Sequence, residues 1–263
     1  MSINTDNPLY KMLEVCADSS ESALTAQKAG AMRIELCANL IIGGTTPTLA
    51  LVEAVKKELS IPVHVLIRPR FGDFCYGKAE ITQMARDIEL CRKAGADGIV
   101  IGCLKIDGSL DEKALRTLMS AAEAKDGAKK ISFTLHRAFD MCKDPFEAYE
   151  KAAELGFDTI LTSGQKASCY EGRFLLKELQ KKRGEKGPVI MAGSGLKPEL
   201  IVPLFEETGV RCFHLSGKKI VQSPMRYKNP EVSMSVKSFS EYELWSADEN
   251  VIREARRQLN GIG

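Results

Sequence analysis

The chain has 263 residues, of which 44% are apolar, and its formal net charge is +2. This balance gives no reason to expect nucleic acid or an anionic membrane surface as a partner. The N-terminal residues lack the apolar core of a secretory signal, and no apolar run approaches the ~18 residues of a membrane span. We therefore expect a cytoplasmic globular protein with no nucleic acid and no membrane partner.

Short β-prone runs alternate with amphipathic, helix-prone stretches along the whole chain. The expected strands are residues 12–17, 32–37, 62–68, 97–102, 131–136, 158–163, 188–192 and 211–216. Four of them follow a glycine placed where a helix would end, at Gly30, Gly95, Gly156 and Gly209. Such a series of strand–helix units predicts an α/β fold, a single-domain (β/α)8 TIM barrel. A doubly wound sheet is less favoured because no GxGxxG follows any strand.

Polar residues mark the expected helix starts. Asp18 and Glu21 form a capping-box pattern, and Asp144 precedes a proline at the first helical position. Thr46 and Asp111 mark two further starts.

The expected domain organisation is simple, because no Pro/Ser-rich linker divides the chain. Residues 1–11 are an N-terminal extension and residues 12–263 form the barrel domain, with a closing helix at 247–260. Residues 217–245 are harder to place, and are either an insertion or a surface for self-association into a homo-oligomer.

Two expected strands carry the same short pattern, LEVCA in the first and IELCA in the second. Side chains alternate along a strand, so Glu14 shares a face with Cys16, and Glu35 shares a face with Cys37. The residues between them are apolar and suit the face that packs under the helices. We therefore expect these four side chains to point into the barrel, with both cysteines at its mouth.

The two thiols lie on adjacent strands and could approach one another, and paired thiolates suit a soft ion such as Cu(I). The alternative is that both cysteines are small buried hydrophobes. The chain has eight cysteines and none of the CxxC, CxxH or HxxxH spacings of metal motifs, so most are expected to be free thiols and no structural zinc site is predicted.

Further polar side chains are expected at the same rim, where the chemistry of such barrels gathers. Arg68 ends the third strand and His136 ends the fifth. Together with Glu14 and Glu35 they resemble an acid/base set with a cation for an anionic group. The alternative is a network of buried ion pairs that holds the barrel centre. His64 lies deeper and is expected to be a core histidine.

The loops after the last two strands are rich in small residues. Backbone N–H groups at this place form the usual anion pocket of these barrels, although tight turns alone would also select glycine. The candidate anion-binding residues are Gly193, Ser194, Gly195, Ser216, Gly217 and Lys218.

Several longer motifs occur along the chain in this order: LEVCADSSESA, RIELC, GGTTPT, PVHVLIRPRFGDFCY, AGADGIVIG, FTLHRAFDM, ILTSGQ and MAGSG. From residue 12 to about residue 236 the chain resembles the CutC family, which is named for copper homeostasis. The resemblance implies a cytoplasmic TIM-barrel protein associated with copper tolerance and often oligomeric. It also implies that Cys16 and Cys37 are the Cu(I) thiols.

Two positions depart from the family pattern. Ile42 stands where a glutamate usually precedes the glycine pair, which removes a carboxylate from the rim. Ser194 stands where glycine is common. Neither position belongs to the two Glu-x-Cys patterns.

Two functions are consistent with these residues. The first is copper(I) binding and copper homeostasis through Cys16 and Cys37, with copper(I) as the bound ion. The second is a barrel enzyme, a lyase, isomerase or hydrolase, that acts on a small phosphorylated or carboxylated metabolite. The fold does not choose between them, and the residues select no specific reaction.

Overall fold

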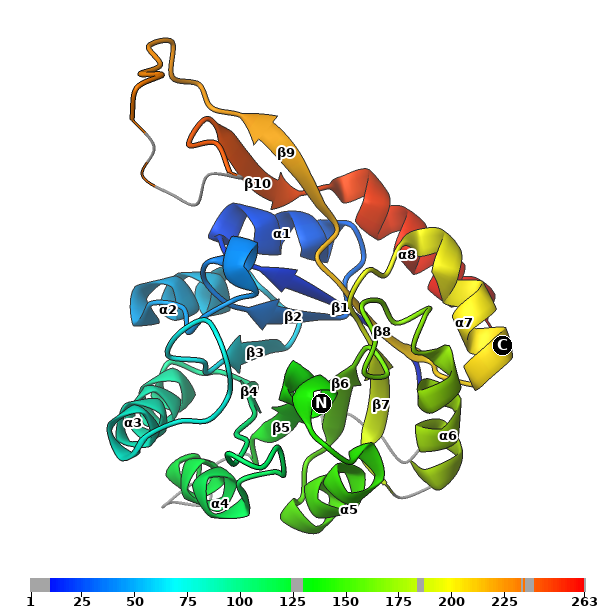
Figure 1. Ribbon diagram of the computed structural model, residues 1–263. Helices are drawn as coiled ribbons and strands as arrows, with labels where there is room; N and C mark the ends of the chain where they lie inside the picture. Colours follow the sequence, from blue (N-terminus) through cyan, green and yellow to red (C-terminus); the bar gives the residue numbers. More distant parts are fainter. Residues whose placement is uncertain (1–9, 124–129, 184–186, 233, 235–238, 263) are drawn as a thin grey trace.

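The structure is a computed structural model that describes residues 10–123, 130–183, 187–232, 234 and 239–262. Eight parallel strands follow the order of the sequence around a closed barrel, with helices outside it (Figure 1). The strands are β1 (Met12–Ala17), β2 (Arg33–Leu36), β3 (Val63–Leu66), β4 (Gly98–Ile101), β5 (Ser132–Leu135), β6 (Thr159–Thr162), β7 (Val189–Ala192) and β8 (Cys212–Leu215). The prediction of a single-domain (β/α)8 TIM barrel is confirmed.

An α-helix follows each of β1 to β7 before the next barrel strand, and the last α-helix follows β8 only after a long intervening segment. The α-helices are α1 (Ser20–Lys28), α2 (Leu49–Glu58), α3 (Lys78–Lys93), α4 (Glu112–Ala121), α5 (Pro145–Leu155), α6 (Arg173–Arg183), α7 (Ile201–Thr208) and α8 (Glu249–Gly261). Three short 3-10 helices, η1 (Leu40–Ile42), η2 (Arg137–Met141) and η3 (Pro198–Leu200), lie in the connections.

The caps of these helices follow the sequence closely. Asp111 and Asp144 cap α4 and α5 as predicted, because their carboxylates accept hydrogen bonds from backbone N–H groups of the first turn. The other two helices begin slightly later than expected, with Ser19 as the N-cap of α1 and Thr48 as the N-cap of α2.

The main hydrophobic core lies between the barrel sheet and the helices. Leu13, Val15, Ile34 and Leu36 are fully buried in it, as the alternation along β1 and β2 predicted. The intervening side chains of the same strands therefore face the barrel interior, which is the part of the fold that carries polar groups.

Residues 217–245 include an antiparallel ribbon outside the barrel. It consists of β9 (Lys218–Gln222) and β10 (Glu243–Ala247), and it projects beyond α1 (Figure 1). The backbone N–H of Ala247 donates to the Ser22 hydroxyl at 3.2 Å, which ties the base of the ribbon to α1. Self-association through this segment stays a prediction.

The region expected to hold the closing helix contains α8. Its residues Ile252, Ala255 and Leu259 are fully buried against the rest of the barrel domain. None of the described helices is long and apolar enough to cross a membrane.

We predict that Gly102→Ala lowers the free energy of unfolding by about 1–3 kcal/mol, as overpacking does in a filled interior. Gly102 follows β4, and a methyl group there would lie 2.5 Å from Cε1 of His136 and 2.7 Å from Cβ of Ala138. Urea denaturation measures the change. Gly261→Ala is the matched control, because a methyl group there meets nothing within 4 Å; equal stability losses in both variants would contradict the packing argument.

Candidate functional site

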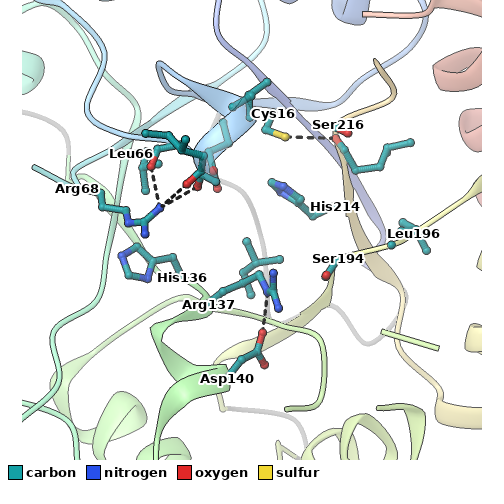
Figure 2. A pocket seen from close by; sticks show the side chains of 18 of the residues that line it. Cys16, Leu66, Arg68, His136, Arg137, Asp140, Ser194, Leu196, His214 and Ser216 are labelled. Atoms are coloured by element: carbon teal, nitrogen blue, oxygen red, sulfur yellow. Dashed lines mark hydrogen bonds and ion pairs between the residues drawn. The ribbon is translucent and has the colours of Figure 1, made fainter. Parts of the chain in front are cut away.

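A cavity of about 590 Å³ opens at the C-terminal ends of the barrel strands (Figure 2). Much of its wall is apolar, from Leu40, Ile42, Leu66, Phe74, Met141, Leu161 and Leu196. Its polar side chains are Cys16, Glu35, Arg68, His136, Arg137, Asp140, Ser194, His214, Ser216 and Lys218. A cavity of this size accommodates a small molecule, and its place in the fold is where such barrels bind ligands.

Most residues selected from the sequence reach this cavity. Those in its wall are Cys16, Glu35, Arg68, His136, Ser194, Gly195, Ser216 and Lys218. Glu14, Cys37, Gly193 and Gly217 are outside the wall. The alternation rule therefore brought the correct strands to one rim, but it did not distinguish the cavity wall from the layer beneath it.

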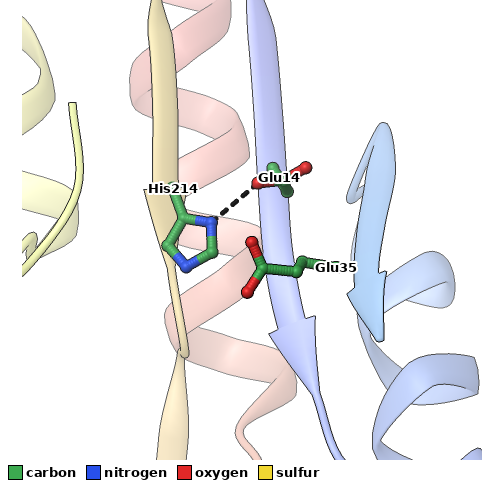
Figure 3. Close-up of side chains that lie close together, drawn as sticks. All are labelled: Glu14, Glu35 and His214. Carbon is green, nitrogen blue, oxygen red and sulfur yellow. Dashed lines mark hydrogen bonds and ion pairs between the residues drawn. The ribbon is translucent and has the colours of Figure 1, made fainter. Parts of the chain in front are cut away.

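Glu14 lies in that deeper layer and is fully buried. One of its carboxylate oxygens accepts a hydrogen bond from Nε of Arg33, and the other lies 2.8 Å from Nδ1 of His214 (Figure 3). Burial alone would raise the pKa of Glu14, but Arg33 and His214 hold it well below its usual range. Glu14 is therefore an ionised carboxylate with both oxygens engaged.

His214 is a site residue that the sequence reasoning missed. It pairs directly with Glu14 in the register between β8 and β1. Burial works against its charged form, but the neighbouring Cys16 sulfur and the carboxylates of Glu14 and Glu35 raise the pKa of His214 well above its usual range. Alternation along β8 carries the signal, because its neighbours Phe213 and Leu215 belong to the core under the helices, which leaves His214 to face the barrel interior.

Glu35 lies next to this pair and lines the cavity (Figure 3). Burial is the main cause that raises the pKa of Glu35 to about 7; the Glu14 charge adds to it, while His214 and Arg33 oppose it. Its Oε2 atom has no hydrogen-bond partner among the described residues. Glu35 can therefore gain or lose a proton near neutral pH, as an acid/base group must.

Ligand atoms of Glu14, Glu35 and His214 all lie within 4.8 Å of one another, a spacing that could hold a metal ion. Both Glu14 oxygens are already engaged by cationic partners, however. A hard divalent cation would have to compete with the Arg33 guanidinium for the same carboxylate. The three groups are better described as a buried charge network.

The two thiols occupy different layers. Cys16 is 7% exposed and is in the cavity wall, whereas Cys37 is fully buried beside Leu66 and Val100. The Cys37 thiol donates to the carbonyl oxygen of Ala17 at 3.5 Å. Burial raises the pKa of Cys37 well above its usual range, and Cys16 is the next contributor, so the two sulfurs are close enough to interact electrostatically.

Arg68 is a buried cation whose partners are neutral. Its Nη1 atom donates to the carbonyl oxygens of Gly43 and Gly44 at 3.2 and 3.0 Å, and its Nη2 atom donates to Gly72 at 2.9 Å. Among the described residues, Nε has no hydrogen-bond partner and no carboxylate pairs with this guanidinium. Arg68 therefore fixes the loop that contains Ile42 and leaves positive charge beside the cavity.

His136 has a defined tautomer. Its Nδ1 atom accepts a hydrogen bond from the backbone N–H of Ala138 at 3.0 Å, so the ring proton is on Nε2. Burial, together with the Arg68 charge, lowers the pKa of His136 to about 3. His136 is thus a neutral hydrogen-bond donor and a weak base, and the acid/base role expected from the sequence stays a prediction.

The loops after β7 and β8 contribute to the cavity wall, and anion binding by them stays a prediction. Ser194 has a φ of +79°, in the left-handed region that favours glycine, and its hydroxyl donates to the Ala167 carbonyl at 3.0 Å. A glycine at this position would have no hydroxyl to form this hydrogen bond. The Lys218 Nζ atom lies 3.0 Å from the ring centroid of Trp245, so the ribbon positions a cation at the rim through a cation–π contact.

Comparison with known proteins identifies the family of this chain. The model of the CutC family matches residues 11–219. The chain belongs to the CutC family. A CutC family protein of Parabacteroides distasonis is 43% identical over 93% of this chain and 99% of its own, and one of Bacteroides thetaiotaomicron is 44% identical over 95% and 96%.

Solved structures agree with this assignment. The Streptococcus agalactiae CutC structure, of a protein assigned to copper homeostasis, is 30% identical with a TM-score of 0.72, and the match covers 79% of this chain and 99% of the other. Phosphoribosylanthranilate isomerase of Pyrococcus furiosus matches with a TM-score of 0.57 over 96% of this chain and 100% of its own, at 13% identity. The second likeness shows the barrel fold alone.

We expect Glu14→Gln to lower the free energy of unfolding by about 3–5 kcal/mol, because it leaves the Arg33 guanidinium buried without a counter-charge. Chemical denaturation near neutral pH measures the loss. Glu89→Gln is the control, since its ion pair with Arg86 is exposed at both side chains and should change stability by less than about 1 kcal/mol. A similar small effect at Glu14 would show that the buried network is not needed for stability.

The tautomer of His136 has a direct spectroscopic consequence. We predict that, of the three histidine rings in the chain, His136 shows the Nε2-protonated tautomer and does not titrate between about pH 5 and 8. Nitrogen-15 NMR of the imidazole rings checks this, with His136→Asn to assign the signal. A His136 signal that titrates near its ordinary pKa of 6.5 would contradict the hydrogen bond from Ala138.

Proposed function

We propose that this CutC family member binds Cu(I) at the mouth of its barrel and serves copper homeostasis. The family name and the Streptococcus agalactiae relative point to this metal, and the donor chemistry of the site supports it. Thiolates are preferred ligands of Cu(I), and soft ligands select it over harder ions.

The observation that carries the proposal is the position of Cys16. All eight cysteines lie among the described residues, and Cys16 is the one that lines the cavity. Cys37 lies just behind it, at the end of the neighbouring strand. Cu(I) that enters the cavity would thus meet one thiol in the wall and a second, fully buried thiol at the end of the neighbouring strand, and binding would release the thiol protons.

His214 supports the same site as a third donor. Its Nδ1–H donates to Glu14, and Nε2 becomes available to a metal once the imidazolium releases its Nε2 proton, as metal binding requires. A carboxylate behind a metal-binding histidine is the usual arrangement, because it orients the ring and fixes the tautomer. The Cys16 sulfur is a neighbour of the His214 ring, so both ligands serve one position (Figure 2).

Burial of the site favours buffering over rapid transfer. Cys37 is fully covered and Cys16 is nearly so, whereas a protein that hands copper to a partner needs exposed thiols. The chain also has no CxxC pair. We therefore propose storage or buffering of Cu(I) as the role of the site.

The enzyme alternative has weaker support from the comparisons. The solved barrel enzymes that resemble this chain, such as the Pyrococcus isomerase, are so distant in sequence that they share the fold alone. Burial also lowers the pKa of His136 to about 3, which makes it a weak base for the expected acid/base set.

Anaerobic Cu(I) titration against a chromophoric competitor tests the proposal. We expect one tightly bound equivalent in the wild type and its loss in both Cys16→Ser and Cys37→Ser. Cys75→Ser is the matched control, because Cys75 is a partly exposed cysteine outside the cavity wall. Loose binding that is spread over all the cysteines and indifferent to these two would overturn the proposal.

His214→Asn sharpens the same experiment. Asparagine can still donate to Glu14 from the position of Nδ1, but it has no atom in the place of Nε2. Loss of an outer-shell metal partner weakens metal affinity by about 10–100-fold, and we expect a loss of Cu(I) affinity at least this large. One equivalent should still be bound by the thiols. Unchanged affinity would remove His214 from the ligand set.

A further inference from the structure

We infer that the cavity also binds a small organic carboxylate with an apolar body, with Arg137 as its ion-pair partner and His136 as a second donor. This site is distinct from the thiols, and the inference does not depend on copper binding. Its basis is the set of donors on the wall made by the ends of β3 and β5 and the apolar surface beside them.

Arg137 is held in place before any ligand arrives. Its Nε atom donates to Asp140 at 2.8 Å and its Nη2 atom lies 3.3 Å from the Ser163 hydroxyl. Figure 2 shows this side chain in the cavity wall between His136 and Ser194. Arg137 is 45% exposed, and no partner of Nη1 is found among the described residues. The guanidinium can therefore donate to a ligand without breaking its existing contacts.

Asp140 accepts hydrogen bonds from several other donors, and its contact with Arg137 uses only the Nε atom of the guanidinium. It accepts hydrogen bonds from the Thr162 hydroxyl at 2.5 Å, from the Ser163 backbone N–H at 3.0 Å and from the Gln165 backbone N–H at 3.2 Å. These contacts fix Asp140 to the end of β6. Asp140 is thus a positioning residue for Arg137, and the ion pair presents a preformed donor to the cavity.

His136 provides a second donor on the same wall. Its Nε2–H has no hydrogen-bond partner among the described residues, although the side chain is 95% buried (5% exposed). A buried polar group without a protein partner is rare in native proteins, so this N–H is a candidate donor to a ligand. The Phe74 ring lies 4.9 Å from the imidazole ring and 5.1 Å from the Arg68 guanidinium, so both groups lie beside the same aromatic ring.

The charge balance of the wall favours an anion. Arg137 is paired with Asp140, whereas Arg68 has only carbonyl partners and Lys218 rests on an aromatic ring. Besides these two cations, the residues that line the cavity include one further carboxylate, that of Glu35. A small anion therefore gains a favourable potential in a site of low dielectric.

The chemistry of the wall selects a carboxylate with an apolar body. Arg137 and His136 offer one donor each to the two oxygens of a carboxylate, whereas a phosphate dianion brings more charge and more acceptors than two donors satisfy. The rest of the ligand would contact Leu40, Leu66, Phe74 and Leu196, which are apolar. An aliphatic or aromatic monocarboxylate meets both requirements.

Isothermal titration of copper-free protein with phenylacetate tests the inference. Phenylacetamide has the same body without the charge, and phenyl phosphate replaces the head group. We expect saturable binding of phenylacetate at one site, no binding of the amide, and weaker binding of the phosphate. No saturable binding of phenylacetate, or tighter binding of phenyl phosphate, would overturn the carboxylate assignment.

Two variants test the named donors. We expect Arg137→Gln and His136→Asn each to weaken phenylacetate binding by about 10-fold or more, as loss of a charged or buried hydrogen bond does. Asparagine can still accept the hydrogen bond from Ala138 in place of Nδ1, so the local fold is kept. Arg173→Gln is the control, because Arg173 forms a similar ion pair with Glu207 outside the cavity and should leave binding unchanged. Unchanged affinity in both test variants would also overturn the inference.

Discussion

Glu14 places a negative charge at the centre of the barrel, where an isolated ion would be costly, and two cations make this tolerable. Arg33 from β2 and His214 from β8 engage its two oxygens, so the carboxylate links the first strand to both of its neighbours at the seam where the barrel closes. Breaking such a network leaves an uncompensated charge, which is why its members constrain one another. The layer of polar groups above it, including Cys16 and Glu35, is built on this base.

The cavity above that base is divided between two kinds of chemistry. Soft donors, Cys16 with Cys37 behind it, lie at the ends of β1 and β2, and His214 completes this side from β8. Nitrogen donors, Arg68, His136 and Arg137, lie at the ends of β3 and β5. The donors of the first side suit Cu(I), and those of the second side suit an anion. The two proposed sites therefore use different protein atoms of the same cavity.

Much of this arrangement could be predicted from the sequence, and the errors are informative. The alternation along β1 and β2 identified Glu14, Cys16 and Glu35 as inward-facing because side-chain direction in a strand is a local property. The sequence placed His136 at the rim, but it did not show its protonation, since the tautomer depends on the backbone N–H of Ala138 and the pKa on burial beside Arg68. The Asp140 contacts with Thr162 and Ser163 also join separate segments, so the positioning of Arg137 was not visible in the sequence.

The sequence by itself determined the alternating strand and helix pattern, the caps at Asp111 and Asp144, and the family, because each depends on neighbouring residues or on the order of motifs. Only the tertiary structure decided which inward groups meet. Glu14 and His214 are 200 residues apart, and they become partners through the register with which β8 closes onto β1. The structure also separates Cys16 in the cavity wall from Cys37, because the register pairs Cys16 with Glu35, and Cys37 follows the end of β2, where Leu66 and Val100 cover it.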